Sequence, residues 1–163
     1  MKKPQGSKTL QKLYIETGIQ KIADVLMRHP DSEFSLSELA RMAGVRKSNV
    51  GAMLRELDKA GFIEIVKLSK IWRIKANQRN PEFLKHKIVF NLHYIYQSNL
   101  VEVLNEHFNN PKCIVLFGSY RRGEDICKSD IDIAIETGEV REYEVIGLRE
   151  LADIEKQLQK KIQ

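Results

Sequence analysis

Two aspartates one residue apart, Asp130 and Asp132, lie at the start of a short apolar run in the segment SDIDIAIE. Side chains alternate between the two faces of a β-strand, so both carboxylates are expected on one face, with Ile131 and Ile133 on the other. Two carboxylates so close repel each other unless a cation lies between them. Magnesium suits hard oxygen ligands of this kind, typically together with substrate phosphates. The pair therefore predicts a magnesium site.

A second polar group follows the preceding apolar run CIVLF, which predicts a buried strand over residues 113–117. Gly118 lets the backbone approach an anionic group closely, and Ser119 adds an N–H and a hydroxyl, as in glycine-containing phosphate loops. Arg121 and Arg122 offer guanidinium groups to a triphosphate, although Arg121 is equally well explained as a surface residue. Glu124 is expected to cap a backbone group or to pair with an arginine.

In order and spacing, these two elements closely resemble those of the minimal nucleotidyltransferases of the DNA polymerase beta superfamily. The G-S-x-x-R-G-E element corresponds to residues 118–124 and the S-D-I-D element to residues 129–132. The resemblance implies a small mixed α/β sheet flanked by helices. It assigns nucleotide binding, with ATP as the expected NTP, to Gly118, Ser119, Arg122 and Ser129. It assigns catalysis and two Mg²⁺ ions to Asp130 and Asp132, with in-line attack of an acceptor hydroxyl on the α-phosphorus and loss of pyrophosphate.

The sequence departs from this family in one respect. The family's third carboxylate usually comes from a strand after the next helix, which is expected here over residues 142–161, and no such strand precedes Gln163. Glu136 shares a strand face with Asp132 but lies about 13 Å from it, too far to complete the same metal site. Two interpretations stay open: an enzyme whose sequence is cut before its last strand, or a DNA-binding regulator whose transferase domain is weak or silent and senses a nucleotide or partner. The helix end at residues 160–163 is expected to leave an apolar sheet edge uncovered, which favours truncation or a homodimer across that edge.

Charge divides the chain into two unlike halves. The net charge is +5, but residues 1–80 hold sixteen basic and eight acidic side chains, so residues 81–163 carry a net charge of −3. Such asymmetry indicates that the first half faces a polyanion, whereas the alternative is that its basic residues only make the surface soluble.

Residues 13–79 show the pattern of a separate domain. Ser35 and Glu38 form a capping-box pair that predicts a helix start. Apolar residues then recur at helical spacing, break at Gly44-Val45 and resume over residues 46–60, which indicates a helix, a tight turn and a second helix. Two alternating runs, FIEIVK and IWRIKA, predict a β-hairpin joined by residues 68–70. A further amphipathic helix is expected upstream, over residues 19–27.

This order of helices and hairpin resembles the winged helix-turn-helix DNA-binding domains over residues 15–76. The resemblance implies that the second helix of the pair enters the major groove of duplex DNA while the hairpin touches the backbone. The expected contacts on the helix are Arg46, Lys47, Ser48, Asn49 and Arg55, and those on the hairpin are Lys67, Lys70 and Arg73. A protein-binding or dimerisation module is the alternative, and the positive charge of residues 1–80 favours nucleic acid.

Asn80-Pro81 predicts the start of a long joining helix over residues 80–110 with a break near Ser98. Its expected apolar face, Leu84, Ile88, Leu92, Ile95 and Tyr96, must pack against the flanking domains or a second copy of the chain. The predicted fold is therefore α+β: a basic tail (1–12), a winged helix-turn-helix domain (13–79), this joining helix and a minimal nucleotidyltransferase domain (111–163).

Composition narrows the remaining classes. No apolar run is long enough to cross a membrane, and the basic, polar N-terminus has no apolar signal segment, so a cytoplasmic protein is expected. Cys113 and Cys127 are too few for a disulfide framework and lack the spacing of a zinc site. The sequence does not indicate which acceptor receives the nucleotide, because a protein side chain, an RNA end and a small molecule all fit the same donor site. The family resemblance makes a small helical partner protein a plausible acceptor.

Overall fold

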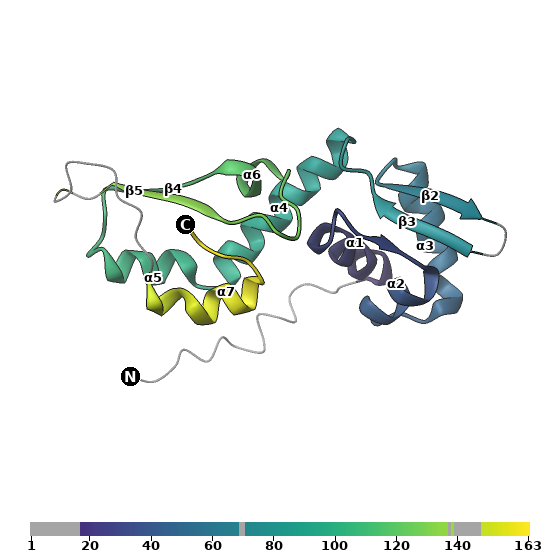
Figure 1. Ribbon diagram of the computed structural model, residues 1–163, viewed down its shortest axis with the longest axis horizontal. Coiled ribbons are helices and arrows are strands. Elements are labelled where there is room, and N and C mark those ends of the chain that lie inside the picture. The colour runs from purple at the N-terminus through teal and green to yellow at the C-terminus, as the bar shows by residue number, and fades with distance from the viewer. Residues whose placement is uncertain (1–16, 69–70, 137, 139–147) are drawn as a thin grey trace.

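A computed structural model describes residues 17–68, 71–136, 138 and 148–163. Figure 1 shows two groups of elements, with a long helix running from one into the other. We call residues 17–80 the N-terminal unit and residues 98–163 the C-terminal unit. Helices and small sheets together make a mixed α+β fold. Within the described ranges, no helix combines the length and apolar character needed to span a membrane.

The N-terminal unit contains three helices and a three-stranded antiparallel sheet. Its elements are α1 (Gly18–Arg28), β1 (Glu33–Phe34), α2 (Leu36–Met42), α3 (Lys47–Lys59), β2 (Ile63–Leu68) and β3 (Ile71–Ala76). The strand order is β1-β3-β2. The predicted order of helices and the hairpin are confirmed. Sequence reasoning missed β1, whose two residues are too few to show an alternating pattern.

Local chemistry explains where α2 begins and how the chain turns into α3. The Ser35 hydroxyl accepts from the Glu38 N–H, and the Glu38 carboxylate accepts from the Ser35 N–H at 2.8 Å, so the predicted capping box is formed. After α2, Gly44 has a φ of +63°, a left-handed conformation that glycine adopts without strain. This residue allows the tight turn between the two helices.

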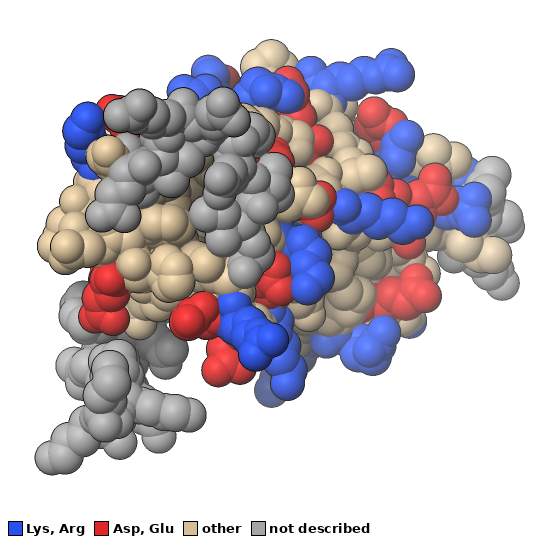
Figure 2. Space-filling model, turned by 60° about the vertical axis from the view of Figure 1, so that its left-hand side comes forward, with Lys and Arg blue, Asp and Glu red and all other residues tan. Residues whose placement is uncertain are grey.

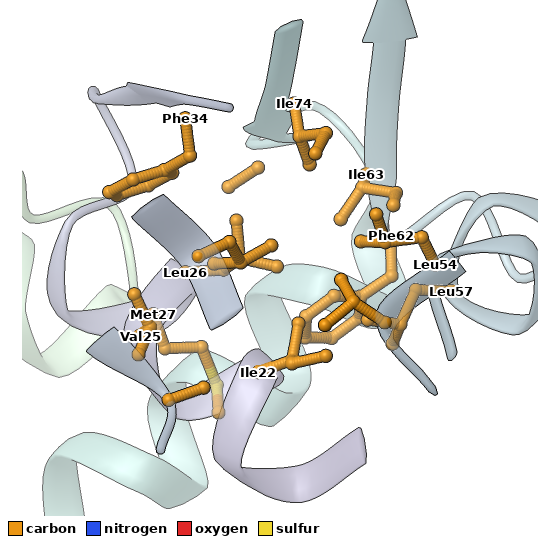
Figure 3. Close-up of a cluster of buried hydrophobic side chains, with 14 of the residues drawn as sticks. Ile22, Val25, Leu26, Met27, Phe34, Leu54, Leu57, Phe62, Ile63 and Ile74 are labelled. Atoms are coloured by element: carbon orange, nitrogen blue, oxygen red, sulfur yellow. The ribbon is translucent and has the colours of Figure 1, made fainter. Parts of the chain in front are cut away.

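The core of the N-terminal unit is made of apolar side chains from all three helices and the sheet. Figure 3 shows Ile22 and Leu26 of α1 in the same cluster as Leu54 of α3 and Ile74 of β3, and all four are fully buried. Phe83 of the next helix completes this core and lies edge-on against Phe62, with ring centroids 4.9 Å apart.

The joining helix is two helices, α4 (Pro81–Gln97) and α5 (Leu100–His107). Asn80 caps α4, and Asn99 has a φ of +58° that ends the helical path where a break was expected. The predicted apolar face is wrong for Leu92 and Tyr96, which are exposed, and confirmed for Ile95; the buried side chains are Phe83, Lys87, Asn91 and Ile95. The inward face of α4 therefore carries two polar residues, Lys87 and Asn91.

The C-terminal unit is built on a two-stranded antiparallel sheet of β4 (Cys113–Phe117) and β5 (Asp132–Glu136). The helix α6 (Gly118–Arg122) follows β4 directly in the sequence. A short 3₁₀ helix (Arg149–Leu151) and α7 (Ala152–Leu158) follow. Figure 1 shows α5 and α7 on one side of the strands. Ile114, Leu116, Ile133 and Ile135 belong to the same core as these helices.

Three expectations for this unit need correction. The first strand is not buried on both faces, because Val115 and Phe117 are 47% and 43% exposed. The helix expected over 142–161 is not continuous: Leu148 is extended, the 3₁₀ turn and α7 follow it as far as Leu158, and residues 142–147 lie outside the described residues. Finally, the edge of β5 is not left uncovered. Residues 161–163 run parallel to it, with a bridge between Ile162 and Ile131 and a hydrogen bond from the Ile133 N–H to the Gln163 carbonyl oxygen.

Candidate nucleotide site and nucleic-acid surface

The pairing of β4 with β5 brings the two predicted motifs together. Phe117 lies opposite Asp132, so Gly118 follows directly beside the aspartate. Gly118 has a φ of +71°, and a Cβ atom at this position would collide with the Asp132 carboxylate. Only glycine fits both the backbone conformation and the space. The Gly-Ser turn and the second aspartate are therefore in direct contact.

Both aspartates lie at the surface end of the sheet. Ile131, between them, is fully buried, so its two neighbours point away from the core, and both are half-buried. The Gln163 amide Nε2 donates to Asp130 Oδ2 at 2.9 Å. Two carboxylates beside a glycine are a donor set of the kind that magnesium prefers. Among the described residues, however, no three His, Cys, Asp or Glu side chains are grouped so that they could hold a metal ion.

The other predicted nucleotide contacts have partners within the protein. Arg122 Nε pairs with Glu124 Oε2 at 2.7 Å, which confirms the expected arginine partner of Glu124. The Ser129 hydroxyl accepts from the Ile126 N–H at 3.0 Å and so closes a turn. Ser119 lies in α6 and is half-buried. Nucleotide binding by these residues remains a prediction, and two of them also shape the loop that leads to Asp130.

Sequence reasoning missed a buried polar network that joins α4 to Tyr120 and Asp125. Lys87 Nζ donates to Asn91 Oδ1 at 2.9 Å and to both oxygens of Asp125 at 2.8 Å. Asn91 Nδ2 donates in turn to Asp125 Oδ1 and to the Tyr120 carbonyl oxygen, both at 2.7 Å. Lys87, Asn91 and Asp125 are each 1% exposed. The only sequence signal was an i, i+4 pair of polar residues on the helix face that also carries Phe83 and Ile95.

Burial shifts the pKa values of this network. Desolvation lowers the pKa of Lys87, and the adjacent Asp125 carboxylate opposes that shift. Desolvation also raises the pKa of Tyr120, so its hydroxyl stays protonated. In the described residues every buried side-chain nitrogen and oxygen has a hydrogen-bond partner. The network is therefore complete without a ligand.

The loop before Asp130 also contacts the N-terminal unit. The Cys127 N–H donates to Asp31 Oδ1 at 3.2 Å, and Cys127 Sγ lies 3.6 Å from His29 Nδ1. Burial would raise the pKa of Asp31, but the hydrogen bonds from Cys127 outweigh it and lower that pKa. Burial and the hydrogen bond to Asp31 raise the pKa of the Cys127 thiol. A cavity of about 160 Å³ beside this contact is lined by residues of α1, α4 and α6 and by residues 158–160.

The predicted DNA contacts on α3 are exposed. Arg46 is the N-cap of this helix, Lys47, Ser48 and Asn49 form its first turn, and Arg55 lies two turns further on. On the hairpin, Lys67 Nζ lies 4.5 Å from the centre of the Trp72 ring, and Arg73 pairs with Glu33 at 3.3 Å. Lys70 lies outside the described residues. On the face shown in Figure 2, basic and acidic side chains are intermixed and form no single basic patch.

Comparison with known proteins bears on the C-terminal unit. Residues 98–163 match the family model described as "Polymerase beta, Nucleotidyltransferase". The C-terminal unit is nucleotidyltransferase-like. The match spans less than half of the chain and does not reach the N-terminal unit.

Two further comparisons add little. A comparison with curated proteins finds no match. Among solved structures, the transcriptional regulator BldR from Sulfolobus solfataricus is similar at 18% identity and a TM-score of 0.35. The alignment covers 56% of this chain and 62% of BldR, so the chain spans less than two thirds of that structure. A similarity of this size carries no argument about fold or function.

Proposed function

We propose that the C-terminal unit binds an NTP, with ATP as the expected donor, and transfers NMP to an acceptor hydroxyl. The observation that carries this proposal is the contact between the Gly118 backbone and the Asp132 carboxylate, within the segment that matches the nucleotidyltransferase family. At this point a phosphate chain can lie against main-chain atoms while its charge faces a carboxylate-bound cation.

Each residue has a distinct role in this proposal. Asp130 and Asp132 would hold Mg²⁺, which when bound offsets the negative charge of the phosphates. Gly118 gives the phosphates close access to the backbone, and Ser119 offers its N–H and hydroxyl. Gln163 donates to Asp130 Oδ2 and so orients one carboxylate, whose other oxygen would then be available to a metal ion.

A second candidate is a regulator whose transferase site binds nucleotide with weak or no chemistry. The favouring observation is that no group of three metal-ligating side chains occurs among residues 17–68, 71–136, 138 and 148–163. Both candidates require the same nucleotide site, and they differ only in whether pyrophosphate is released.

Calorimetry with ATP, with and without Mg²⁺, tests the site. We expect metal-dependent binding that the double variant Asp130→Asn, Asp132→Asn abolishes and that Asp153→Asn, an exposed change on α7, leaves intact. Binding that survives the double substitution would exclude this site. A pyrophosphate assay on the same samples separates the two candidates, because only the enzyme releases pyrophosphate from ATP and an acceptor.

We also propose that the N-terminal unit is a winged helix-turn-helix domain that binds duplex DNA. The supporting observation is the N-cap and first turn of α3, where two cationic and two hydrogen-bonding side chains are exposed together. The exposed basic residues beside a helix start would meet phosphates or base edges in the major groove.

Fluorescence anisotropy with labelled duplex DNA at two salt concentrations tests this second proposal. Arg46→Ala should weaken binding by about 1–3 kcal/mol if the side chain reads a base, and less if it meets only phosphate. Lys59→Ala, at the opposite end of α3, is the matched control. Affinity that is absent, or that does not change with salt, would rule out duplex DNA as the partner.

A further inference from the structure

The loop between α6 and Asp130 has no helix or strand to hold it. Residues 124–131 join the Gly-Ser turn to the first aspartate of the proposed nucleotide site, and only the turn from Ile126 to Ser129 orders them locally. Any ligand bound between the two motifs needs this loop in one position. Its path is therefore set by contacts from outside the loop.

One side chain, Lys160, makes three of these contacts. Lys160 Nζ donates to the Ile126 carbonyl oxygen at 2.7 Å and to the Ser129 carbonyl oxygen at 3.3 Å, and it lies 3.2 Å from Asp125 Oδ2. The ammonium group thus donates two hydrogen bonds to the turn and forms an ion pair with the residue before it. The side chain is 9% exposed.

Asp125 connects the Lys160 ammonium group to α4. Its carboxylate is shared between Lys160 and Lys87, and it is fixed from the α4 side by Lys87 and Asn91. Gly123, two residues earlier, packs so closely on α4 that a Cβ atom would lie 2.8 Å from the Leu84 carbonyl oxygen. The start of the loop is therefore anchored to α4, Cys127 contacts Asp31, and Lys160 holds the carbonyl groups of Ile126 and Ser129.

Lys160 is also the residue from which the chain enters the sheet. The Ile131 N–H donates to the carbonyl oxygen of the next residue, Lys161, at 2.8 Å, and Gln163 then reaches Asp130. Lys160 Nζ thus contacts the peptide unit before Asp130, through the Ser129 carbonyl oxygen, and the Lys161 carbonyl oxygen accepts from the peptide unit after it.

We propose that Lys160 is a positioning residue for the nucleotide site, which holds Ser129 and Asp130 where Asp130 can share a metal ion with Asp132. This proposal rests on the proposed nucleotide-binding function. Lys160 acts through the carbonyl groups of Ile126 and Ser129 and through Asp125, and it does not itself touch the metal or the nucleotide.

The variant Lys160→Met tests the proposal, with Lys156→Met as the control, because Lys156 is exposed one turn earlier on the same segment. Lys160→Met should still fold, since Asp125 keeps Lys87 as its buried partner. We expect Mg²⁺-dependent ATP binding to weaken by about 10- to 100-fold, as for other residues that orient metal ligands, with Mg²⁺-independent binding unchanged. Lys160→Arg should restore part of the loss. A folded Lys160→Met protein that binds MgATP as tightly as the wild type would overturn the proposal.

Labelling of Cys127 with a thiol reagent gives a second measurement that needs no nucleotide. In a Cys113→Ser background, Cys127 is the remaining cysteine and lies in the loop. Lys160→Met should label faster than the wild type, and Lys156→Met should not. An unchanged rate would overturn the positioning role even if ATP binding had changed. Absence of MgATP binding in the wild type together with faster labelling would refute only the proposed function. If Lys160→Met does not fold, Lys160→Gln, which keeps one donor, replaces it in both measurements.

Discussion

Different kinds of interaction stabilise the two units of this protein. The N-terminal unit has a core of apolar side chains from three helices and a sheet, including Leu26 and Leu54. The C-terminal unit has a smaller apolar core, and its Asp125 forms a fully buried ion pair with Lys87 of α4. Burial of apolar area stabilises a fold without regard to direction, whereas a buried ion pair is stable only in one geometry. The unit with the candidate site thus uses the interaction that fixes position.

The largest effect is expected from Asp125→Ala. This change leaves the Lys87 ammonium buried without its carboxylate, and breaking a buried pair in this way costs about 3–5 kcal/mol. Urea unfolding followed by far-UV circular dichroism measures the loss. Trp72, the one tryptophan, lies in β3, so its fluorescence follows the N-terminal unit and should shift less.

Two outcomes would contradict this expectation. Equal shifts of both signals would show that the units unfold as one, through α4, which contributes Phe83 to one core and Ile95 to the other. A double variant, Lys87→Met with Asp125→Ala, should be more stable than Asp125→Ala alone, because the fully buried Lys87 ammonium group is then no longer left without its carboxylate. A double variant of lower stability would mean that packing, and not charge, causes the loss.

The next effect tests the other unit. Leu26→Ala removes a fully buried side chain from the apolar core and should cost about 2–5 kcal/mol, the range for a leucine truncated in a packed interior. Here the Trp72 signal should shift at least as much as the circular dichroism signal. Leu92→Ala is the control, because Leu92 is 40% exposed on α4 and its truncation opens no cavity. A similar loss for both variants would mean that the exposed face of α4 is covered in solution.

These two units also differ in how much the sequence predicts. In the N-terminal unit the helix starts, the turn at Gly44 and the hairpin follow from residues within a few positions of each other, and the structure agrees. In α4 the apolar pattern predicted that Leu92 and Tyr96 face inward, and the helix instead buries Lys87 and Asn91. The reason is Asp125, a partner 38 residues away from Lys87, whose position in space no local pattern gives.

The candidate site also combines contacts that the sequence predicts with contacts that it does not predict. The contact between Gly118 and Asp132 was predictable, because a strand register and a known motif spacing bring them together. The contacts of Lys160 and Gln163 were not, since they depend on how residues 160–163 return to the edge of β5. The acidic pair is thus readable from spacing, whereas the groups that orient it come from distant parts of the chain.

The smallest effect concerns an interaction that is wholly local. Ser35→Ala removes the hydroxyl that accepts from the Glu38 N–H at the start of α2, and loss of such a cap typically costs about 1 kcal/mol. Ser37→Ala is a matched control two residues away, because Ser37 is exposed in the first turn and is not the cap. Urea unfolding followed by Trp72 fluorescence should show the loss only for Ser35→Ala. If this loss equalled that of Asp125→Ala, local capping would specify this protein as strongly as the distant ion pair, and the contrast between the two units would not hold.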